Sequence, residues 1–314
     1  MDPNEPIPLD KGTEARDGGQ FPFSNEEWRT TGEMMAAGKS ATVLSHDIAP
    51  GLEPDYTYLK GDMTAAYNVP GNISKTYPDK AGMVRRSFVF LNHHSDRVPA
   101  TMIVLDKVVS TQSNFKKTWL LHTEDEPEIN GNITSARRTD SGRNVMLQTT
   151  VLLPERGNQQ IQKIGGPGKE FWVDGRNWGT KTYTDIGQWR VELSPGENTL
   201  SDNFLNVIQV MDAEPAPKPL PIQKVFSDKN DYVAVTVGNR MVVQNLLLEK
   251  GAKSFGWTIG DKGKLYDVLV TDLKKGIWVV KIASATKRVL VISEKGTAYF
   301  RSNGGKFELK FLHE

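Results

Sequence analysis

The chain has 314 residues, no Cys, and 39 Lys plus Arg against 38 Asp plus Glu, which gives a formal net charge of +1. The lack of Cys excludes disulfides, thiolate nucleophiles and cysteine metal sites, and the balanced charge gives no long-range attraction to nucleic acid or to an anionic membrane. The 28 Gly, 17 Pro and seven Trp favour an all-β protein with many turns, and the length suggests about two domains.

The N-terminal region shows few signs of compact structure. Residues 1–20 are acidic, contain Pro and Gly and carry little apolar surface, so we expect an extended lead-in. They hold no apolar signal-peptide core, and no apolar run approaches the roughly 18 residues of a membrane span. We therefore expect either a cytosolic protein or an export signal upstream, with a periplasmic or secreted location if the chain is part of a longer exported protein. A capping box at Ser24 to Glu27 predicts a short helix over about residues 25–37.

Three strongly apolar segments follow one another between Val84 and Pro127. They cover 84–91, 101–109 and 116–122, are rich in Val, Ile, Phe or Trp, and are bounded by turn residues, a pattern typical of strands in a packed sheet. The same pattern predicts further strands at 41–44, 55–59, 133–138, 144–153, 187–193 and 203–210.

The clearest boundary in the sequence is the segment 212–221. Its four prolines cannot donate to a sheet ladder and favour polyproline II, so we predict a linker. Beyond it, short apolar segments such as 232–237 and 241–248 recur about every 8–12 residues, with Gly-containing turns between them. The chain is therefore predicted to be all-β, with a large antiparallel β-sandwich over 21–211 and a smaller β-sandwich-like unit over 222–314.

Three polar residues of the central stretch are weak candidates for a metal site: His93, Asp106 and His122. Imidazole and carboxylate groups from neighbouring strands can form a three-ligand zinc site with one open position. However, the sequence has no local signature such as HExxH, and His93 and His94 fall in a predicted hairpin loop. We favour ordinary surface or sheet-edge histidines and expect neither metal nor cofactor.

A basic and aromatic segment between 163 and 181 is the best candidate for a binding face. Lys169 and Arg176 alternate with Trp172 and Trp178, and such side chains can stack on a sugar or bind an anion. The alternative is that the aromatic residues pack the sandwich and the basic residues solvate its rim. The GGPG cluster at 165–168 lacks the spacing of a phosphate-binding loop, so we interpret it as a tight turn.

Several ordered segments resemble the C-terminal β-sheet half of heparinase II/III-type polysaccharide lyases. They are GDMTAAY (61–67), VRRSFVFL (84–91), MIVLDKV (102–108), FKKTWLLHTEDEPEI (115–129), KIGGPGKEFWVDGRN (163–177) and WRVELSPG (189–196). The resemblance covers most of residues 1–212 and, more loosely, the last hundred. It implies a large antiparallel β-sandwich that packs against an N-terminal α/α toroid of the same protein.

The resemblance also implies cleavage of acidic polysaccharides, such as heparin-like chains or alginate, by β-elimination. That reaction needs a group that neutralises the uronate carboxylate, a base for the C5 proton and an acid for the leaving oxygen. In the family these groups come from the toroid and from HxHxD-like and HNT-like segments, and neither segment occurs in this chain. We therefore assign no catalytic residue and expect the chain to begin beyond the reaction centre.

Three hypotheses for function remain. The first is a non-catalytic scaffold or substrate-presenting part of a lyase whose partner is an acidic polysaccharide, with no nucleic-acid or membrane partner. The second is a free-standing carbohydrate-binding β-protein that uses Lys169, Trp172, Arg176 and Trp178. The third is a self-sufficient lyase that uses His93 or His94 as base and Tyr183 as acid.

Overall fold

The computed structural model describes residues 30, 32, 33, 41–68, 79–140, 142–173, 175–177, 187–215, 217–282 and 286–314. The predicted lead-in, 1–20, and almost all of the predicted helix, 25–37, lie outside these residues. The chain divides into two compact units. Unit 1 is Met1–Leu44, Gly61–Arg86 and Ile103–Pro217, and unit 2 is Ser45–Lys60, Ser87–Met102 and Lys218–Glu314.

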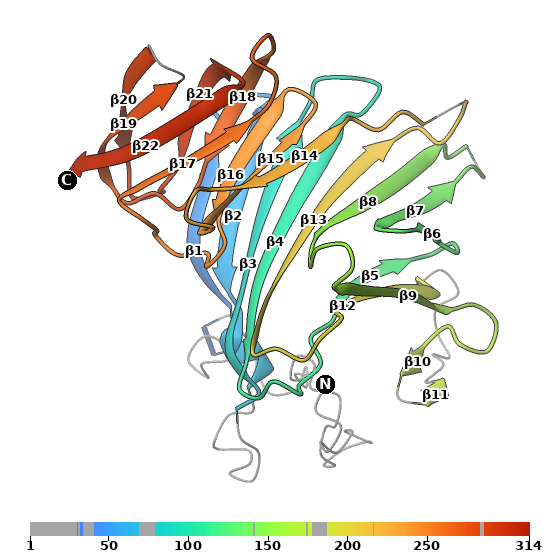
Figure 1. The fold of residues 1–314 in the computed structure, drawn as a ribbon. Helices are drawn as coiled ribbons and strands as arrows, with labels where there is room; N and C mark the ends of the chain where they lie inside the picture. The colour runs from blue at the N-terminus through green and yellow to red at the C-terminus, as the bar shows by residue number, and fades with distance from the viewer. Residues whose placement is uncertain are drawn as a thin grey trace. The chain divides into compact units, whose positions relative to one another are not determined.

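The largest sheet has eight strands (Figure 1), and four of them, β1, β2, β3 and β4, contribute residues to both units. In spatial order the strands are β1 (Thr42–Ile48), β2 (Tyr56–Asp62), β3 (Ala81–Asn92), β4 (Ala100–Ser110), β13 (Ser201–Met211), β8 (Val145–Leu153), β7 (Ile133–Arg138) and β6 (Glu128–Asn130). A single 3-10 turn, η1 (Thr64–Tyr67), follows β2. No helix among the described residues is long and apolar enough to cross a membrane.

Unit 1 also holds a three-stranded antiparallel sheet and a small hairpin. The sheet has the order β5 (Trp119–Thr123), β12 (Trp189–Pro195), β9 (Gln159–Gly165), and the hairpin pairs β10 (Trp172–Val173) with β11 (Arg176–Asn177). In the register of β12, Arg190 lies opposite His122, and Glu192 lies opposite Leu120 and Gln162. Because alternate residues of a strand share a face, the side chains of Arg190 and Glu192 lie on the same face of this sheet.

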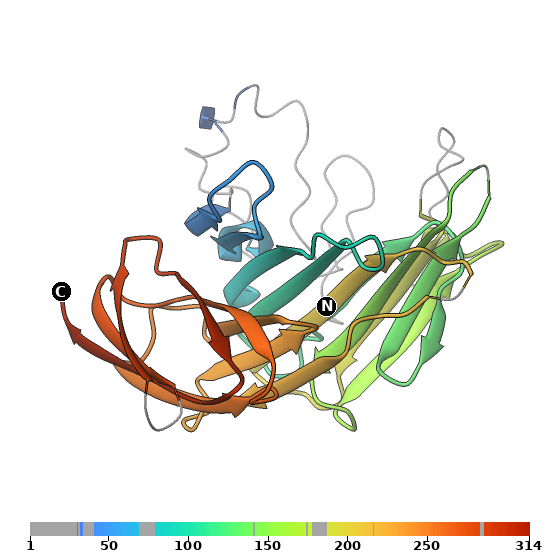
Figure 2. The ribbon, with the colours of Figure 1, turned by 90° about the horizontal axis from the view of Figure 1, so that it is seen from above.

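Unit 2 contains two further sheets. One has the order β14 (Ile222–Phe226), β15 (Tyr232–Val237), β16 (Arg240–Asn245), β18 (Leu265–Val270), β21 (Ala298–Asn303). The other has the order β17 (Ser254–Ile259), β22 (Gly305–His313), β19 (Gly276–Ile282), β20 (Thr286–Ile292). Figure 2 shows the strands of 222–314, coloured orange to red, as two layers that curve around a shared interior.

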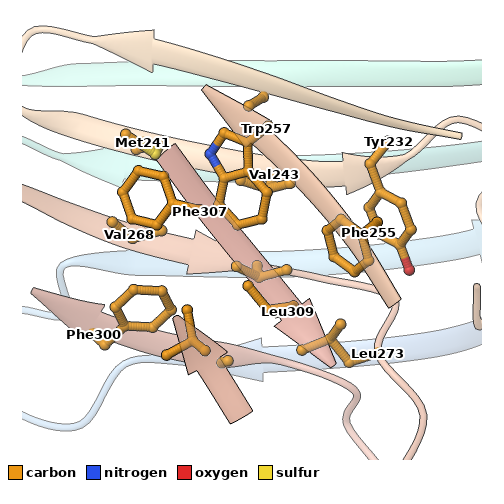
Figure 3. Packing of buried hydrophobic residues seen from close by; sticks show 14 of the residues in the cluster. Tyr232, Met241, Val243, Phe255, Trp257, Val268, Leu273, Phe300, Phe307 and Leu309 are labelled. Atoms are coloured by element: carbon orange, nitrogen blue, oxygen red, sulfur yellow. The ribbon is translucent and has the colours of Figure 1, made fainter. Parts of the chain in front are cut away.

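The core of unit 2 lies between these two sheets and is rich in aromatic rings (Figure 3). Phe255 stacks on Tyr232 with ring centres 3.8 Å apart, and Trp257 stacks on Phe307 with ring centres 4.9 Å apart. Rings of this size bury large apolar areas, and stacked pairs add about 0.5–1.5 kcal/mol beyond that burial. The core therefore explains why a segment of fewer than a hundred residues can hold two sheets together.

The central strands β15 and β16 of the five-stranded sheet of unit 2 are buried on both faces, which is why β15 is apolar without alternation. All six residues of β15 are buried, and those of one face, Tyr232 and Ala234, belong to the core between the two sheets. The other face contacts the segments 45–60 and 87–102. There, Gln244 Nε2 donates to Ser87 Oγ at 2.6 Å, and the rings of Tyr56 and Tyr299 lie 5.0 Å apart. These contacts explain why both segments belong to unit 2.

The predicted all-β fold is confirmed, with two differences in detail. The predicted strand 241–248 ends at Asn245 because the chain turns there and Leu248 has a positive φ of 51°. In addition, β16 and β18 pair in parallel, whereas the other strand pairs with a described register are antiparallel. The boundary between Pro217 and Lys218 lies inside the predicted linker 212–221, but unit 2 also includes 45–60 and 87–102. The predicted domains 21–211 and 222–314 stay a prediction.

Candidate functional site

Two of the four residues predicted to bind a sugar lie together at the start of the β10–β11 hairpin. The N–H of Lys169 donates to the Gly166 carbonyl at 2.8 Å, and the N–H of Trp172 donates to the Lys169 carbonyl at 3.3 Å. This turn places Lys169 Nζ 5.6 Å from the centre of the Trp172 ring, within the range of a cation–π interaction. Lys169 is exposed and Trp172 is half-buried.

The other two predicted residues are less informative. Arg176 lies in β11, where its backbone pairs with Val173 of β10. Trp178 lies outside the described residues, as does Tyr183, the acid in the hypothesis of a self-sufficient lyase. The predicted binding face therefore rests on Lys169 and Trp172.

The glycine cluster at the end of β9 has a packing role. A Cβ on Gly166, whose φ is +76°, would lie 2.7 Å from the ring of Trp189. Lys163 Nζ lies 5.7 Å from the centre of the same ring. The loop can therefore lie against Trp189 only because it has no side chain at this point.

We expect Gly166→Ala to lower the free energy of unfolding by about 1–3 kcal/mol, since the new methyl group must displace a ring or the backbone. Urea unfolding followed by tryptophan fluorescence measures this change. The matched control is Gly168→Ala, because Gly168 has a similar φ of +81° but nothing within 4 Å of an added Cβ. Equal losses of unfolding free energy in the two variants would show that the contact with Trp189 does not contribute to stability.

The three weak metal candidates each have other partners. His93 Nε2 lies 2.9 Å from Thr101 Oγ1, and both carboxylate oxygens of Asp106 accept hydrogen bonds from Arg86. His122 lies opposite Arg190 in the sheet register, and burial and the positive charge of Arg190 lower the pKa of its imidazole. Among the described residues, no three His, Asp or Glu side chains are placed to hold one metal ion.

Sequence reasoning did not find a cavity of unit 1 that is lined by many charged side chains, and we call it the charged cavity. Its volume is about 510 Å³, within the usual range of ligand pockets. It is lined by β3, β4 and β13 of the large sheet, by β5 and β12 of the three-stranded sheet, and by Val173 of β10. Its charged lining residues are Lys80, Arg86, Asp106, Lys116, Lys117, Arg190 and Glu192, and its aromatic ones are Tyr67, Phe115, Trp119 and Phe204.

The large sheet contributes the pair Arg86–Asp106 to the charged cavity. Arg86 Nε donates to Asp106 Oδ1 at 2.5 Å, and Arg86 Nη2 donates to Asp106 Oδ2 at 2.9 Å. Such a two-point contact fixes the orientation of both groups. Burial raises the pKa of the Asp106 carboxyl, and the guanidinium of Arg86 offsets part of this rise. The side chain of Asp106 is 3 % exposed and that of Arg86 is 33 % exposed, so the pair extends from the interior of the cavity toward solvent.

The three-stranded sheet contributes Arg190 and Glu192. Arg190 Nε donates to Glu192 Oε1 at 2.9 Å, and Gln162 Nε2 donates to Glu192 Oε2 at 2.8 Å. Burial favours a raised pKa at Glu192, but the hydrogen bonds from Gln162 and Arg190 outweigh it and hold the pKa of this carboxyl below its usual value. Glu192 is therefore ionised at neutral pH and holds Arg190 in place.

Arg190 also links the charged cavity to the predicted binding face. Its Nη2 donates to the Trp172 carbonyl at 2.9 Å, and Val173, the next residue, lines the cavity. The only sequence signal for the cavity was the segment FKKTW (115–119), in which two lysines lie between two aromatic residues. That pattern says nothing about Arg86 or Arg190, which reach the cavity from other strands.

Comparison with known proteins identifies a match in the C-terminal part of the chain. Residues 226–311 match the family model of the heparinase II C-terminal domain. This confirms the resemblance over a range within unit 2, where the sequence likeness was looser. A search of curated proteins gives no match.

Two solved lyases also match. One is the heparan sulfate lyase HepC from Pedobacter heparinus, with 15% identity, a TM-score of 0.40 and coverage of 77% of this chain and 36% of that chain. The other is a heparinase III, with 12% identity, a TM-score of 0.36 and coverage of 65% of this chain and 27% of that chain. The chain thus spans about a third of the length of these lyases.

Proposed function

We propose that this chain is the β-sheet portion of a heparinase II/III-like polysaccharide lyase, and that it binds and presents an acidic, uronate-containing glycan without cutting it. The observation that carries the proposal is the match of residues 226–311 to the heparinase II C-terminal domain. In this proposal, an α/α toroid of the same protein supplies the remaining part of the enzyme.

The pair Lys169–Trp172 supports binding of an acidic sugar. A half-buried indole offers a flat apolar surface to the C–H face of a sugar ring, and the ammonium group beside it attracts a carboxylate or sulfate. A glycan chain carries such an anion on many of its residues, so several weak contacts of this kind add up along the polymer.

The protonation state of His93 supports the non-catalytic part of the proposal. Burial, together with the electrostatic effects of Arg240 and His94, lowers the pKa of His93 to about 4. A general base works best when its pKa lies near the operating pH, so His93 is a weak base for removing a sugar C5 proton at neutral pH. This argues against the self-sufficient lyase that uses His93.

The second candidate, a free-standing carbohydrate-binding protein, is favoured by the same Lys169–Trp172 pair. This candidate predicts that the chain alone binds the glycan with full affinity, and that adding a toroid raises neither the affinity nor the activity. The lyase proposal predicts that adding the toroid segment in cis restores cleavage.

The test mixes the purified chain with heparan sulfate, heparin and alginate. We expect salt-sensitive binding of at least one polymer and no rise in the ultraviolet absorbance of unsaturated uronates. Trp172→Ala should weaken binding by roughly three- to thirtyfold, because it removes one cation–π and stacking contact. Phe226→Ala is the matched control, because Lys224 Nζ lies 4.7 Å from the centre of the Phe226 ring in unit 2.

Two outcomes would contradict the proposal. A dose-dependent rise in absorbance would show that the chain cuts, and the absence of binding to every acidic polymer would show that it does not present substrate. Circular dichroism of each variant establishes that a loss of binding is not a loss of fold.

A further inference from the structure

We propose that the charged cavity of unit 1 is a binding subsite for one anionic sugar residue, whose carboxylate or sulfate lies beside Arg190 and Lys116. The choice of a sugar as ligand rests on the proposed function. The cavity itself, its charge and its donors are properties of the described residues.

The charge of the lining favours an anion. Five of the lining residues are cationic and two are acidic, which leaves a surplus of 5 − 2 = 3 positive charges. Asp202 pairs with Lys117 at 3.1 Å without lining the cavity, and counting it reduces the surplus to two. A cavity walled by protein strengthens such a surplus, because the local dielectric is lower than that of water.

Arg190 is the donor best placed to bind the anion. Its Nε and Nη2 are occupied by Glu192 and by the Trp172 carbonyl, while its Nη1 has no protein partner in the part of the chain that the structure describes. The side chain is only 14 % exposed, so its position is fixed by these contacts. Lys116, 44 % exposed and 3.8 Å from Glu192, adds a second charge beside it.

The remaining lining fits a sugar better than a bare ion. Phe115 and Trp119 are nearly buried and supply an apolar wall. The carboxylates of Asp106 and Glu192 are hydrogen-bond acceptors, which sugar hydroxyl groups can satisfy. A pocket with aromatic walls and a few polar groups at fixed positions is the usual design for a small polar ligand.

The link between Arg190 and Trp172 suggests how a polymer would lie. Because Arg190 bonds to the carbonyl of Trp172 and Val173 lines the cavity, a sugar stacked on Trp172 would have its neighbouring residue close to the cavity. The Lys169–Trp172 pair and the charged cavity would then bind successive parts of one chain.

The test measures binding of four probes to the full chain by isothermal titration: glucuronate, N-acetylglucosamine 6-sulfate, glucose and inorganic sulfate. We expect the two anionic sugars to bind and glucose to bind at least roughly tenfold more weakly, since a charge-assisted hydrogen bond is lost. If inorganic sulfate binds as tightly as the sugars, or glucose binds as tightly as glucuronate, the proposal is overturned.

Two variants locate the binding. Arg190→Gln should weaken glucuronate binding by roughly tenfold or more, and Lys116→Ala by about threefold to tenfold. Lys116 is largely exposed, so its variant keeps the test valid if Arg190→Gln fails to fold. Lys310→Ala, an exposed lysine of β22, is the control and should leave binding unchanged. Unchanged affinity in both cavity variants would overturn the proposal.

The two proposals fail in different ways. If heparan sulfate binds and Trp172→Ala weakens that binding as expected, but neither anionic monosaccharide binds, only the charged cavity is excluded as a subsite. If the monosaccharides bind and Arg190→Gln weakens their binding, while no polymer binds, then the presentation of a glycan chain is excluded. The charged cavity remains a binding subsite in that case.

Discussion

Asp272→Asn should lower the free energy of unfolding of unit 2 by about 3–5 kcal/mol, because it leaves Lys60 charged and buried without its counter-charge. Lys60 Nζ donates to Asp272 Oδ1, and the side chains are 6 % and 0 % exposed. Tyr58 Oη donates to the same carboxylate at 3.1 Å, and Thr271 Oγ1 at 2.8 Å. Asn keeps the shape of Asp and tolerates the positive φ of 63° at this position, so the variant removes little except the charge.

A second variant separates the charge from the packing. Lys60→Met combined with Asp272→Asn removes both charges, so the double variant should be more stable than Asp272→Asn alone. The control is Glu294→Gln, which removes an exposed ion pair with Lys275 (N···O 2.9 Å) and should leave stability unchanged within error.

The measurement needs a probe within unit 2, because a chain with two units need not unfold in one step. The indole N–H of Trp278 is suitable, since it donates to the Lys274 carbonyl at 2.9 Å and the side chain is fully buried. Its NMR signal and its hydrogen exchange report the stability of this unit. If Asp272→Asn lost no more stability than Glu294→Gln, the pair would not be the energetic feature that its burial indicates.

The strands were predictable because their pattern is local. The apolar segments 84–91 and 232–237 lie within β3 and β15, and the turns between strands carry Gly or Pro, so periodicity and turn residues located most elements. The end of β16 was missed because nothing in the apolar run 241–248 marks the turn at Leu248. Short strands such as β6 and β10 were also missed, since three or two residues show no period.

The charged cavity was not predictable because it depends on strand register. Arg86 and Arg190 are separated by about a hundred residues, and a shift of one residue in β12 would turn Arg190 to the opposite face of its sheet. The predicted pair Lys169–Trp172 was found because its two members are three residues apart and share one turn. For the same reason, no local pattern could place 45–60 and 87–102 in unit 2, where they contact β16 and β21.

The stability of unit 2 should fall as the pH falls from 6.5 toward 4, because of His93. In the folded chain, burial and the electrostatic effects of Arg240 and His94 lower the pKa of His93 to about 4. In the unfolded chain His93 has its ordinary pKa near 6.5, so between these values the unfolded state binds a proton that the folded state does not. The contribution of His93 to the free energy of unfolding is therefore fully present above pH 6.5. As the pH falls from 6.5 to 4, it declines by up to about 1.4 kcal/mol per pH unit, roughly 3 kcal/mol in all.

His93→Gln tests this assignment. Gln can keep the contact that His93 Nε2 makes with Thr101 Oγ1 at 2.9 Å, but it does not titrate, so the decline between pH 6.5 and 4 should shrink. The signal of the His93 ring protons should itself shift near pH 4. A midpoint near 6.5, or the same decline in His93→Gln, would contradict the assignment.

A second loss of stability at lower pH has a different origin and serves as an internal reference. Burial favours raised pKa values at Asp47 and Asp55, but hydrogen bonds outweigh it, so the pKa of each carboxyl stays below 3.8. Groups with lowered carboxyl pKa values stabilise the fold above the ordinary pKa and lose this contribution as the pH falls through the folded value. His93→Gln should therefore remove the upper part of the acid transition and leave the part below pH 3.8 in place. Loss of both parts together would mean that the variant disturbs the contacts of Asp55 and Arg240, and that the fall above pH 4 does not come from the imidazole alone.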